Sequence, residues 1–253
     1  MCNLKCEYCY QAIDTEKFQA SDENITEFIN EICNREGFKT VSTVVLFGGE
    51  PLLYPDRFFR ALELLELKTQ ETGKQFAIST TTNGIAFLNP SILGKFKDTV
   101  SNLKNHFTLE ISYDGKGHDR RVYPSGKYSK ADVEKALSLF EPNDITIRYT
   151  IHAGNYKCVL GDLVALQKYR KIILNYYETE LDLHTDVRAL KAKIRRIAEY
   201  LYTIYGKPIC YANCELCKAC NFELFNGINY NGEISVDGNA NGFNHFSQLK
   251  VLK

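Results

Sequence analysis

The chain contains the stretch Met1-Cys2-Asn3-Leu4-Lys5-Cys6-Glu7-Tyr8-Cys9-Tyr10, in which three cysteines are spaced as C-x3-C-x2-C. Three thiolates at this spacing can bind one centre, but they leave a fourth position without a protein ligand. Zinc sites either complete four protein ligands or keep one position open for water. A 4Fe-4S cluster held by three cysteines leaves one iron open to a further molecule. The stretch therefore indicates a metal or cluster site with one open position.

A second motif follows about forty residues later. Residues 41–47 are β-branched and mostly apolar, which predicts a buried parallel strand. The strand ends in Gly48-Gly49-Glu50-Pro51. Glycines at a strand end let the backbone approach a ligand closely, and Glu50 can accept hydrogen bonds from an ammonium group.

The two motifs together resemble those of the radical S-adenosylmethionine (SAM) superfamily, including the aromatic residue Tyr8 before the third cysteine. The resemblance implies that Cys2, Cys6 and Cys9 hold a catalytic 4Fe-4S cluster whose open iron chelates SAM. Half of a zinc site is the alternative for these cysteines. The resemblance also implies that the second motif binds the SAM amino group, through Gly48, Gly49, Glu50 and Pro51.

Composition fits a soluble globular protein with one large domain, or one domain and an extension. The chain has 253 residues, of which 44% are hydrophobic and 25% charged. Lys+Arg and Asp+Glu both number 31, so no net charge favours nucleic acid or an anionic membrane. Nine cysteines, seven of them in two tight clusters, suit metal binding in a reducing compartment. Without a signal-like start or an apolar run near about 18 residues, we expect a cytoplasmic protein and no membrane or nucleic-acid partner.

Predicted strands and helices alternate along the chain. Helical patterns separate the strands predicted at 41–47, 75–83, 106–112, 145–152 and 171–177. This rhythm is typical of βα units around a parallel sheet. We therefore predict an α/β fold, a partial (β/α)6 TIM-like barrel with a small Cys-rich C-terminal extension.

The alternation within two strands predicts a polar interior. In a barrel, one strand face meets the outer helices and the other faces the lumen. The apolar residues of strands 106–112 and 145–152 must take the helix side. The lumen side then carries polar groups, which indicate a ligand cavity because burying them without partners is costly; an open sheet with one solvated face is the alternative. The predicted lumen residues are Thr108, Glu110, Ser112, Arg148, Thr150 and His152.

The segment Ile111-Ser112-Tyr113-Asp114-Gly115, followed by His118-Asp119 and Arg121, resembles a motif of the SPASM-type branch, whose members modify peptides and proteins. The resemblance implies that Ser112 helps to hold SAM. Asn83, at the end of its strand, matches a position that faces the cofactor in the family. We expect Asp114 and Arg121 to shape the turn after the strand or to contact substrate. From strand parity, Arg148 is a candidate partner of the SAM carboxylate, whereas His152 reads as a strand-end histidine with satisfied hydrogen bonds.

A second cysteine cluster lies near the C-terminus. Cys210, Cys214, Cys217 and Cys220 can close one four-ligand site, which suits either a 4Fe-4S cluster or zinc. The resemblance to SPASM enzymes favours an auxiliary 4Fe-4S cluster. Residues 227–238 read as a hairpin around Asn231-Gly232.

These patterns divide the chain into a partial barrel at 1–178, an amphipathic connecting helix at 179–207 and a Cys-rich region at 208–253. The basic residues of that helix indicate a solvated surface or a site for an acidic leader peptide. Two departures from the family are expected: a first barrel strand ahead of Cys2 is missing, and the SPASM-like region is shortened, with at most one auxiliary cluster.

We therefore predict a radical SAM enzyme that forms a 5′-deoxyadenosyl radical and abstracts hydrogen from a peptide or protein. The resemblance implies a reductant such as flavodoxin or ferredoxin as partner. By position, Glu110 and Asp237 are candidates for a general base. The alternatives are a radical SAM enzyme acting on a small molecule, and a non-catalytic truncated relative or four-cysteine zinc protein.

Overall fold

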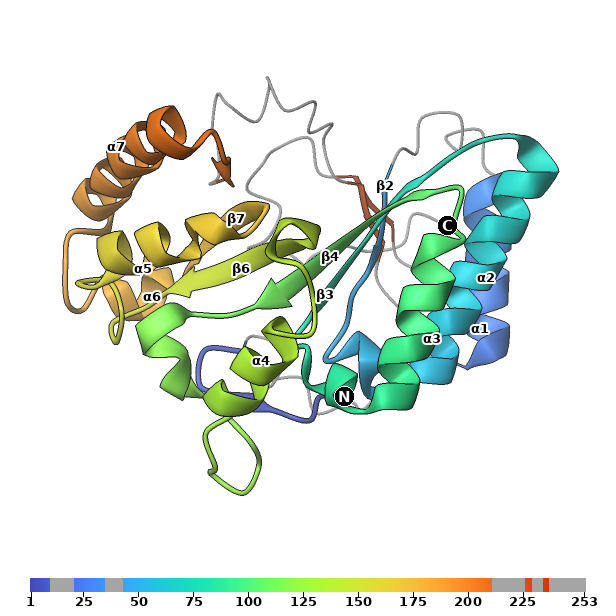
Figure 1. The fold of residues 1–253 in the computed structure, drawn as a ribbon, viewed down its shortest axis with the longest axis horizontal. Helices are drawn as coiled ribbons and strands as arrows, with labels where there is room; N and C mark the ends of the chain where they lie inside the picture. The colour runs from blue at the N-terminus through green and yellow to red at the C-terminus, as the bar shows by residue number, and fades with distance from the viewer. Residues whose placement is uncertain (10–20, 35–42, 211–225, 229–233, 237–253) are drawn as a thin grey trace.

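The structure is a computed structural model that describes residues 1–9, 21–34, 43–210, 226–228 and 234–236. Its centre is a sheet of six parallel strands, and Figure 1 shows this sheet running between two groups of helices. The strands are β2 (Thr43–Leu46), β3 (Ala77–Thr82), β4 (His106–Ser112), β6 (Ile145–Ile151), β7 (Lys171–Tyr176) and β8 (Ile209–Cys210). They lie in the order β2-β3-β4-β6-β7-β8.

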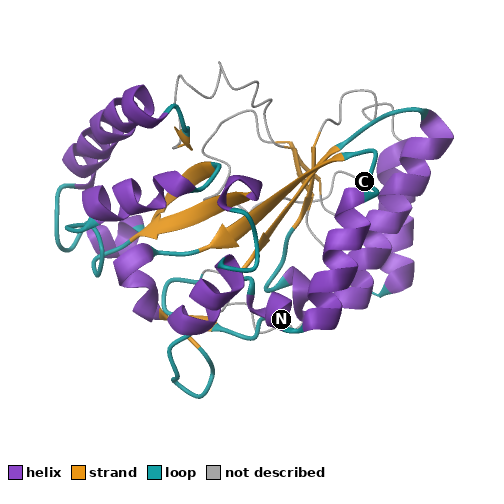
Figure 2. Ribbon diagram, viewed as in Figure 1, coloured by secondary structure: helices purple, strands orange, loops and turns teal. Residues whose placement is uncertain are grey.

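Helices connect successive strands, as the alternation predicts (Figure 2). The α-helices are α1 (Asp22–Asn34), α2 (Pro55–Thr72), α3 (Pro90–Ser101), α4 (Lys130–Leu137), α5 (Val159–Ala165), α6 (Glu178–Leu181) and α7 (Val187–Tyr205). Short 3-10 helices are η3 (Pro51–Leu53), η4 (Ile85–Leu88), η5 (Gly115–Arg120), η6 (Pro142–Asp144) and η7 (Leu166–Lys168). In Figure 1, α1–α3 stand together at the β2 end of the sheet and α5–α7 at the β7 end.

Local sequence signals set the ends of these helices. Pro55 occupies the first turn of α2, where a missing N–H costs nothing. Gly73 ends the helix with φ 72°, a left-handed conformation that favours glycine, and its N–H donates to the Thr69 carbonyl at 2.9 Å. Asp186 caps α7 by accepting from two backbone N–H groups, and Gly206 ends it with φ 66°. α7 covers Val187–Tyr205, a shorter span than the connecting helix predicted at 179–207, because the separate helix α6 and the turn after it precede it.

The parity predicted for the central strands is confirmed by their contacts. Ile111 and Ile147 are fully buried in the hydrophobic core. On the opposite face, the Glu110 carboxylate accepts from the Thr81 hydroxyl at 2.7 Å and from Arg148 Nε at 2.5 Å. β4 and β6 therefore share one polar face and one apolar face, and Thr81 of β3 joins the polar groups, which satisfy one another.

The sheet is open among the described residues, where no strand joins β2 to β8, and the prediction of a partial parallel barrel in an α/β fold is confirmed. One detail differs from the sequence prediction, which made 171–177 the last strand. β8 follows α7 and pairs in parallel with β7, with Ile209 opposite Ile172. A two-residue strand is too short to show an alternation, so the pattern could not reveal it.

The C-terminal hairpin is present as β9 (Asn226–Ile228) and β10 (Ile234–Val236), which pair antiparallel with Gly227 opposite Ser235. β9 lies beside β2. Cys210 is buried at the end of β8. The other predicted ligands of the second cluster, Cys214, Cys217 and Cys220, and the candidate base Asp237 lie outside the described residues. The domain boundaries proposed from the sequence stay predictions.

No helix within the described ranges is both long enough and apolar enough to cross a membrane.

Candidate functional site

The N-terminal loop, residues 1–9, is held at the carboxyl edge of the sheet by backbone hydrogen bonds at two places. The Glu50 N–H, just after β2, donates to the Met1 carbonyl at 2.9 Å. Further along, β1 (Lys5–Cys6) pairs antiparallel with β5 (Arg121–Val122), which follows β4 and η5. The loop therefore bridges the ends of β2 and β4, where ligands of parallel α/β proteins bind.

Side chains add two further anchors to this loop. The Asn83 amide, beyond the end of β3, donates to Asn3 Oδ1 at 2.7 Å. Asn83 Oδ1 accepts from the Ile85 N–H at 3.0 Å, so the side chain is held from both ends. The second anchor is Tyr8, whose phenol donates to the Asp114 carboxylate.

The three cysteines of the loop are half-buried and electrostatically coupled. Burial raises the pKa of Cys6 to about 11, although Arg121 opposes this. Burial also raises the pKa of Cys2. The Leu4 N–H, which donates to Cys2 Sγ at 3.4 Å, acts to lower this pKa but does not outweigh burial. Negative charge on Cys9 raises the pKa values of Cys2 and Cys6 further, so the three sulfurs are close enough to interact electrostatically.

This donor set fits a three-cysteine 4Fe-4S cluster. Thiols with raised pKa values become thiolates only beside a strong positive partner, which the iron of a cluster supplies. Within the described ranges, no three Cys, His, Asp or Glu side chains are placed to hold a single metal ion. A cluster does not need that convergence, because each cysteine binds its own iron.

The Gly48–Pro51 turn lies directly against the start of the chain. A Cβ on Gly49 would be 2.2 Å from the Met1 carbonyl oxygen, so this position needs glycine for the close approach. Glu50 is buried, and its carboxylate accepts from the Leu52 N–H at 3.1 Å, the Thr82 hydroxyl at 2.5 Å and the Asn83 N–H at 2.8 Å. Burial raises the pKa of Glu50, and these three hydrogen bonds oppose the rise. Glu50 thus joins the ends of β2 and β3.

The other residues predicted to hold SAM lie on the polar face of the sheet. Ser112 is half-buried at the end of β4, directly opposite Arg148 in the β4–β6 register. Arg148 is buried and paired with Glu110. This ion pair fixes the orientation of Arg148. It also means that Glu110, the candidate general base, already has a structural partner. The SAM contacts of Ser112 and Arg148 stay predictions.

Asp114, in the turn after β4, is fully buried and is the centre of a dense hydrogen-bond network. Arg121 donates to it with Nε at 2.6 Å and Nη2 at 3.1 Å, and the Thr150 N–H donates at 2.9 Å. Burial acts to raise the pKa of Asp114, but the guanidinium of Arg121 outweighs it and holds the pKa below its usual value. The predicted turn-shaping role of Asp114 and Arg121 is confirmed.

Two buried histidines beside this turn have both ring nitrogens engaged. His152 Nδ1 accepts from the Gly154 N–H at 3.0 Å, so Nε2 carries the proton toward the Gly117 carbonyl at 3.2 Å. His118 Nδ1 accepts from the Asp114 N–H at 3.2 Å, and Nε2 lies 3.4 Å from Ser129 Oγ. Burial lowers the pKa of both rings, to about 3 for His118. The interpretation of His152 as a satisfied strand-end histidine is confirmed.

Sequence reasoning missed several residues that fasten the loop. The motif alone gives Tyr8 no structural role, yet its ring stacks on His152 at 5.4 Å between centroids. Arg120 lies with Nε 3.4 Å from Glu7 Oε2 and also contacts Glu180 of α6. Burial acts to raise the pKa of Glu180, but the Ala153 N–H and Arg120 outweigh it and lower the pKa. The aromatic residue in the motif was a signal for the Tyr8 anchor; for Arg120 and Glu180 no local signal exists.

Comparisons with known proteins agree with this geometry. The family model of the Radical SAM superfamily matches residues 1–155. An uncharacterized protein of Archaeoglobus fulgidus (strain ATCC 49558 / DSM 4304 / JCM 9628 / NBRC 100126 / VC-16) is 27% identical over 157 residues, which are 62% of this chain and 34% of that protein. The chain thus spans about a third of the length of this curated relative.

Two solved structures share the fold. One, described as "Native anSMEcpe with bound AdoMet", is 17% identical with a TM-score of 0.69, over 92% of this chain and 71% of that one. The other, "Native anSMEcpe with bound AdoMet and Cp18Cys peptide", is 20% identical with a TM-score of 0.55, over 70% of this chain and 48% of that one. Because the family model covers more than half of the chain, including the cysteine loop and the Gly-Gly-Glu-Pro turn, this protein belongs to the radical SAM superfamily.

Proposed function

We propose that this protein is a radical SAM enzyme that modifies a peptide or protein. The observation that carries the proposal is the N-terminal loop, which gathers three half-buried thiols at the carboxyl edge of the parallel sheet. The loop lies against the Gly48–Pro51 turn, which the superfamily resemblance assigns to SAM. Membership of the superfamily implies a 4Fe-4S cluster with SAM.

In this proposal, Cys2, Cys6 and Cys9 hold the cluster. When bound, the cluster supplies one electron to SAM, which splits into methionine and a 5′-deoxyadenosyl radical that takes a hydrogen atom from the substrate. The chain's own residues bind and orient SAM, and Tyr8 and Asn83 keep the loop in place during the reaction. The proposed SAM-binding residues are Gly48, Gly49, Glu50, Pro51, Asn83, Ser112 and Arg148.

A peptide substrate is supported by the related fold that was solved with a bound peptide. The second cysteine cluster supports the same branch of the superfamily. In the proposal, Cys210, Cys214, Cys217 and Cys220 hold an auxiliary 4Fe-4S cluster that accepts the electron left on the substrate radical. Zinc at this second site is the alternative.

The test is anaerobic. The full chain is reconstituted with iron and sulfide, reduced with dithionite and given SAM, and 5′-deoxyadenosine is quantified with the iron and zinc content of each sample. We expect the wild-type protein to form 5′-deoxyadenosine and Cys6→Ala to form none. Cys158→Ala is the matched control, since Cys158 is exposed and lies outside the N-terminal loop; it should keep the activity.

Zinc in place of iron at the loop, or equal product from wild type and Cys6→Ala, would refute the proposal. A short precursor-like reading frame beside the gene would separate a peptide substrate from a small molecule. Mass spectrometry of that peptide after incubation with the enzyme then identifies the modification.

A further inference from the structure

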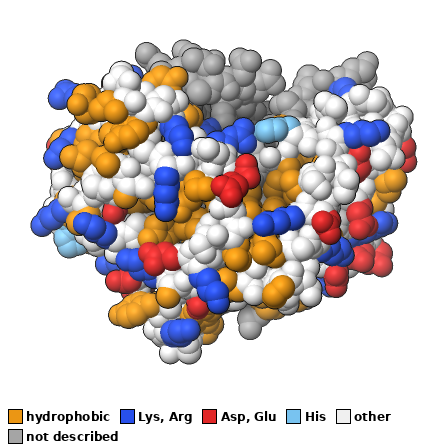
Figure 3. Space-filling model, in the orientation of Figure 1, with side chains coloured by type: hydrophobic (Ala, Val, Ile, Leu, Met, Phe, Trp, Pro, Cys, Tyr) orange, Lys and Arg blue, Asp and Glu red, His pale blue; other side chains and the backbone are white. Residues whose placement is uncertain are grey.

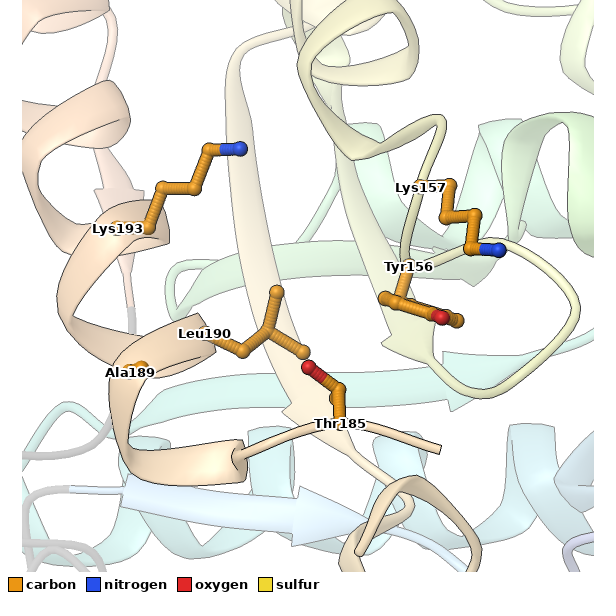
Figure 4. Close-up of a pocket in the computed structure, with 6 residues that line it drawn as sticks. All are labelled: Tyr156, Lys157, Thr185, Ala189, Leu190 and Lys193. Carbon is orange, nitrogen blue, oxygen red and sulfur yellow. The ribbon is translucent and has the colours of Figure 1, made fainter. Parts of the chain in front are cut away.

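A cleft opens between the loop after β6 and the start of α7, and neither the cluster nor the SAM site uses it. Its volume is about 370 Å³, within the range of ligand sites. Figure 4 shows Lys157 and Tyr156 on one wall, and Lys193, Leu190 and Ala189 of α7 with Thr185 on the other. We refer to these six residues as the lysine cleft.

The lysine cleft is joined to the N-terminal loop by a short series of contacts. The Tyr156 N–H donates to the His152 carbonyl at 3.0 Å. The ring of His152 stacks on Tyr8, which lies between Cys6 and Cys9. On the other wall, Thr185 follows α6, the helix that Arg120 links to the same loop. The cleft is thus formed by the segments after β6 and β7, at the edge of the sheet that carries the cysteines.

Positive charge in the cleft is not neutralised by the described part of the protein. Lys157 and Lys193 are exposed, and no described carboxylate lies within 4.0 Å of either ammonium group. Two other basic residues of α7 are paired, Lys191 with Glu178 at 2.5 Å and Arg195 with Glu199 at 3.0 Å, whereas Arg188 and Arg196 are exposed and lie outside the cleft. Figure 3 shows Lys and Arg side chains around exposed hydrophobic ones at the α5–α7 end of the molecule. A negatively charged occupant complements this cleft.

The lining also contains carbon surface and hydroxyl groups. Leu190 and the Tyr156 ring are half-buried in the walls, and the ammonium of Lys157 lies 5.5 Å from the centre of that ring. Thr185 and Tyr156 add hydroxyl groups, which can donate to a carboxylate. A cleft of this volume with apolar walls is larger than an inorganic anion requires, so it suits an acidic side chain with part of its peptide backbone.

We infer that the lysine cleft is a subsite for an acidic residue of the peptide substrate, an inference that rests on the proposed function. Lys157 and Lys193 supply the positive charge that attracts the carboxylate, and Leu190 and Tyr156 pack against the neighbouring carbon atoms. Bound there, the substrate is anchored beside the N-terminal loop while another of its residues reaches the reacting centre.

The test uses the full reconstituted protein and a fluorescein-labelled glycine-serine peptide that carries glutamates, with a matched peptide in which each glutamate is glutamine. Binding is followed by fluorescence anisotropy. We expect Lys157→Gln/Lys193→Gln to weaken binding of the glutamate peptide by about 10-fold, as the loss of two partly exposed charge pairs implies. The control is Arg188→Gln/Arg196→Gln, which removes two exposed α7 charges outside the cleft and should bind as the wild type does.

Equal weakening in both double variants, equal binding of the two peptides, or no binding at all would overturn the inference. Inorganic phosphate that displaces the peptide at an equal concentration would overturn it too, in favour of a small-anion site. Formation of 5′-deoxyadenosine without peptide is measured on the same samples. If the wild-type protein binds the glutamate peptide selectively but forms no 5′-deoxyadenosine, the proposed function alone is contradicted. If it forms 5′-deoxyadenosine but does not bind the peptide selectively, only the subsite is contradicted.

Discussion

The phenol of Tyr8 donates a hydrogen bond to the buried carboxylate of Asp114, which fastens the cysteine loop to the turn after β4. The Tyr8 ring stacks on the ring of His152 and also lies near the guanidinium of Arg121, whose central carbon is 5.2 Å from the ring centre. A residue inside the ligand motif is therefore also its structural anchor, held by polar and aromatic contacts at once.

Removing only the phenol oxygen tests this anchor. Tyr8→Phe leaves a buried carboxylate with one hydrogen bond fewer, which should lower the free energy of unfolding by about 1.5–3 kcal/mol. Urea denaturation followed by circular dichroism measures the change. Tyr200→Phe is the control, because Tyr200 is 65% exposed and its substitution should stay within about 0.5 kcal/mol of wild type. A Tyr8→Phe protein as stable as that control would show that the contact is not an anchor.

Gly49→Ala tests the close approach of the chain start to the Gly48–Pro51 turn. The added methyl group would meet the Met1 carbonyl oxygen at 2.2 Å, so Met1 must move and its hydrogen bond from the Glu50 N–H is lost. We expect a folded protein that retains less iron and sulfide per chain after reconstitution, because Cys2 moves with Met1. Metal analysis and circular dichroism measure the two effects.

The control for this substitution is Gly94→Ala in α3, where a Cβ meets nothing within 4 Å. An alanine inside a helix should stabilise the protein by about 0.5–1 kcal/mol and leave iron binding unchanged. Wild-type iron content in Gly49→Ala would mean that the turn tolerates a side chain at this position.

His118 should make the protein sensitive to mild acid. Its pKa is about 3 in the folded protein and 6.5 ordinarily, so the unfolded chain binds a proton first as the pH falls. The stability from the neutral ring is therefore fully present above pH 6.5 and is lost progressively toward pH 3. Between pH 7 and pH 5 this amounts to about 2 kcal/mol.

His118→Gln should remove this part of the pH dependence, while His152, whose pKa is also lowered, keeps a part of its own. Urea denaturation at pH 7 and pH 5 gives the comparison. His184→Gln is the control at an exposed histidine and should keep the wild-type slope. An unchanged slope in His118→Gln would contradict a buried neutral ring at this position.

Local patterns in the sequence were enough to predict the parallel sheet and its polar face. Pro55 and Gly73, which mark the ends of α2, act through the backbone of their own helix. The alternation around Glu110 and Arg148 follows the two-residue period of side chains along a strand. These signals need no knowledge of distant contacts, which is why they were reliable.

The remaining features depend on residues far apart in sequence. The Tyr8–Asp114 hydrogen bond joins residues separated by 106 positions, and no local pattern announces it. The lysine cleft likewise combines the loop after β6 with the start of α7. Only the folded chain shows that Glu50, which the motif predicts to bind SAM, also joins β2 to β3.

The pairing of Lys5 with Val122 sets an order of events during synthesis. The ribosome makes residues 1–9 well before residues 121–122, so the cysteine loop has no backbone partner at β5 until Val122 has been added. Its three thiols are gathered only after the preceding βα units have been translated. If these thiols hold the proposed cluster, iron meets the assembled loop only after residue 122 has been added, and a ribosome stalled before residue 121 would hold a chain with all three cysteines but without this pairing.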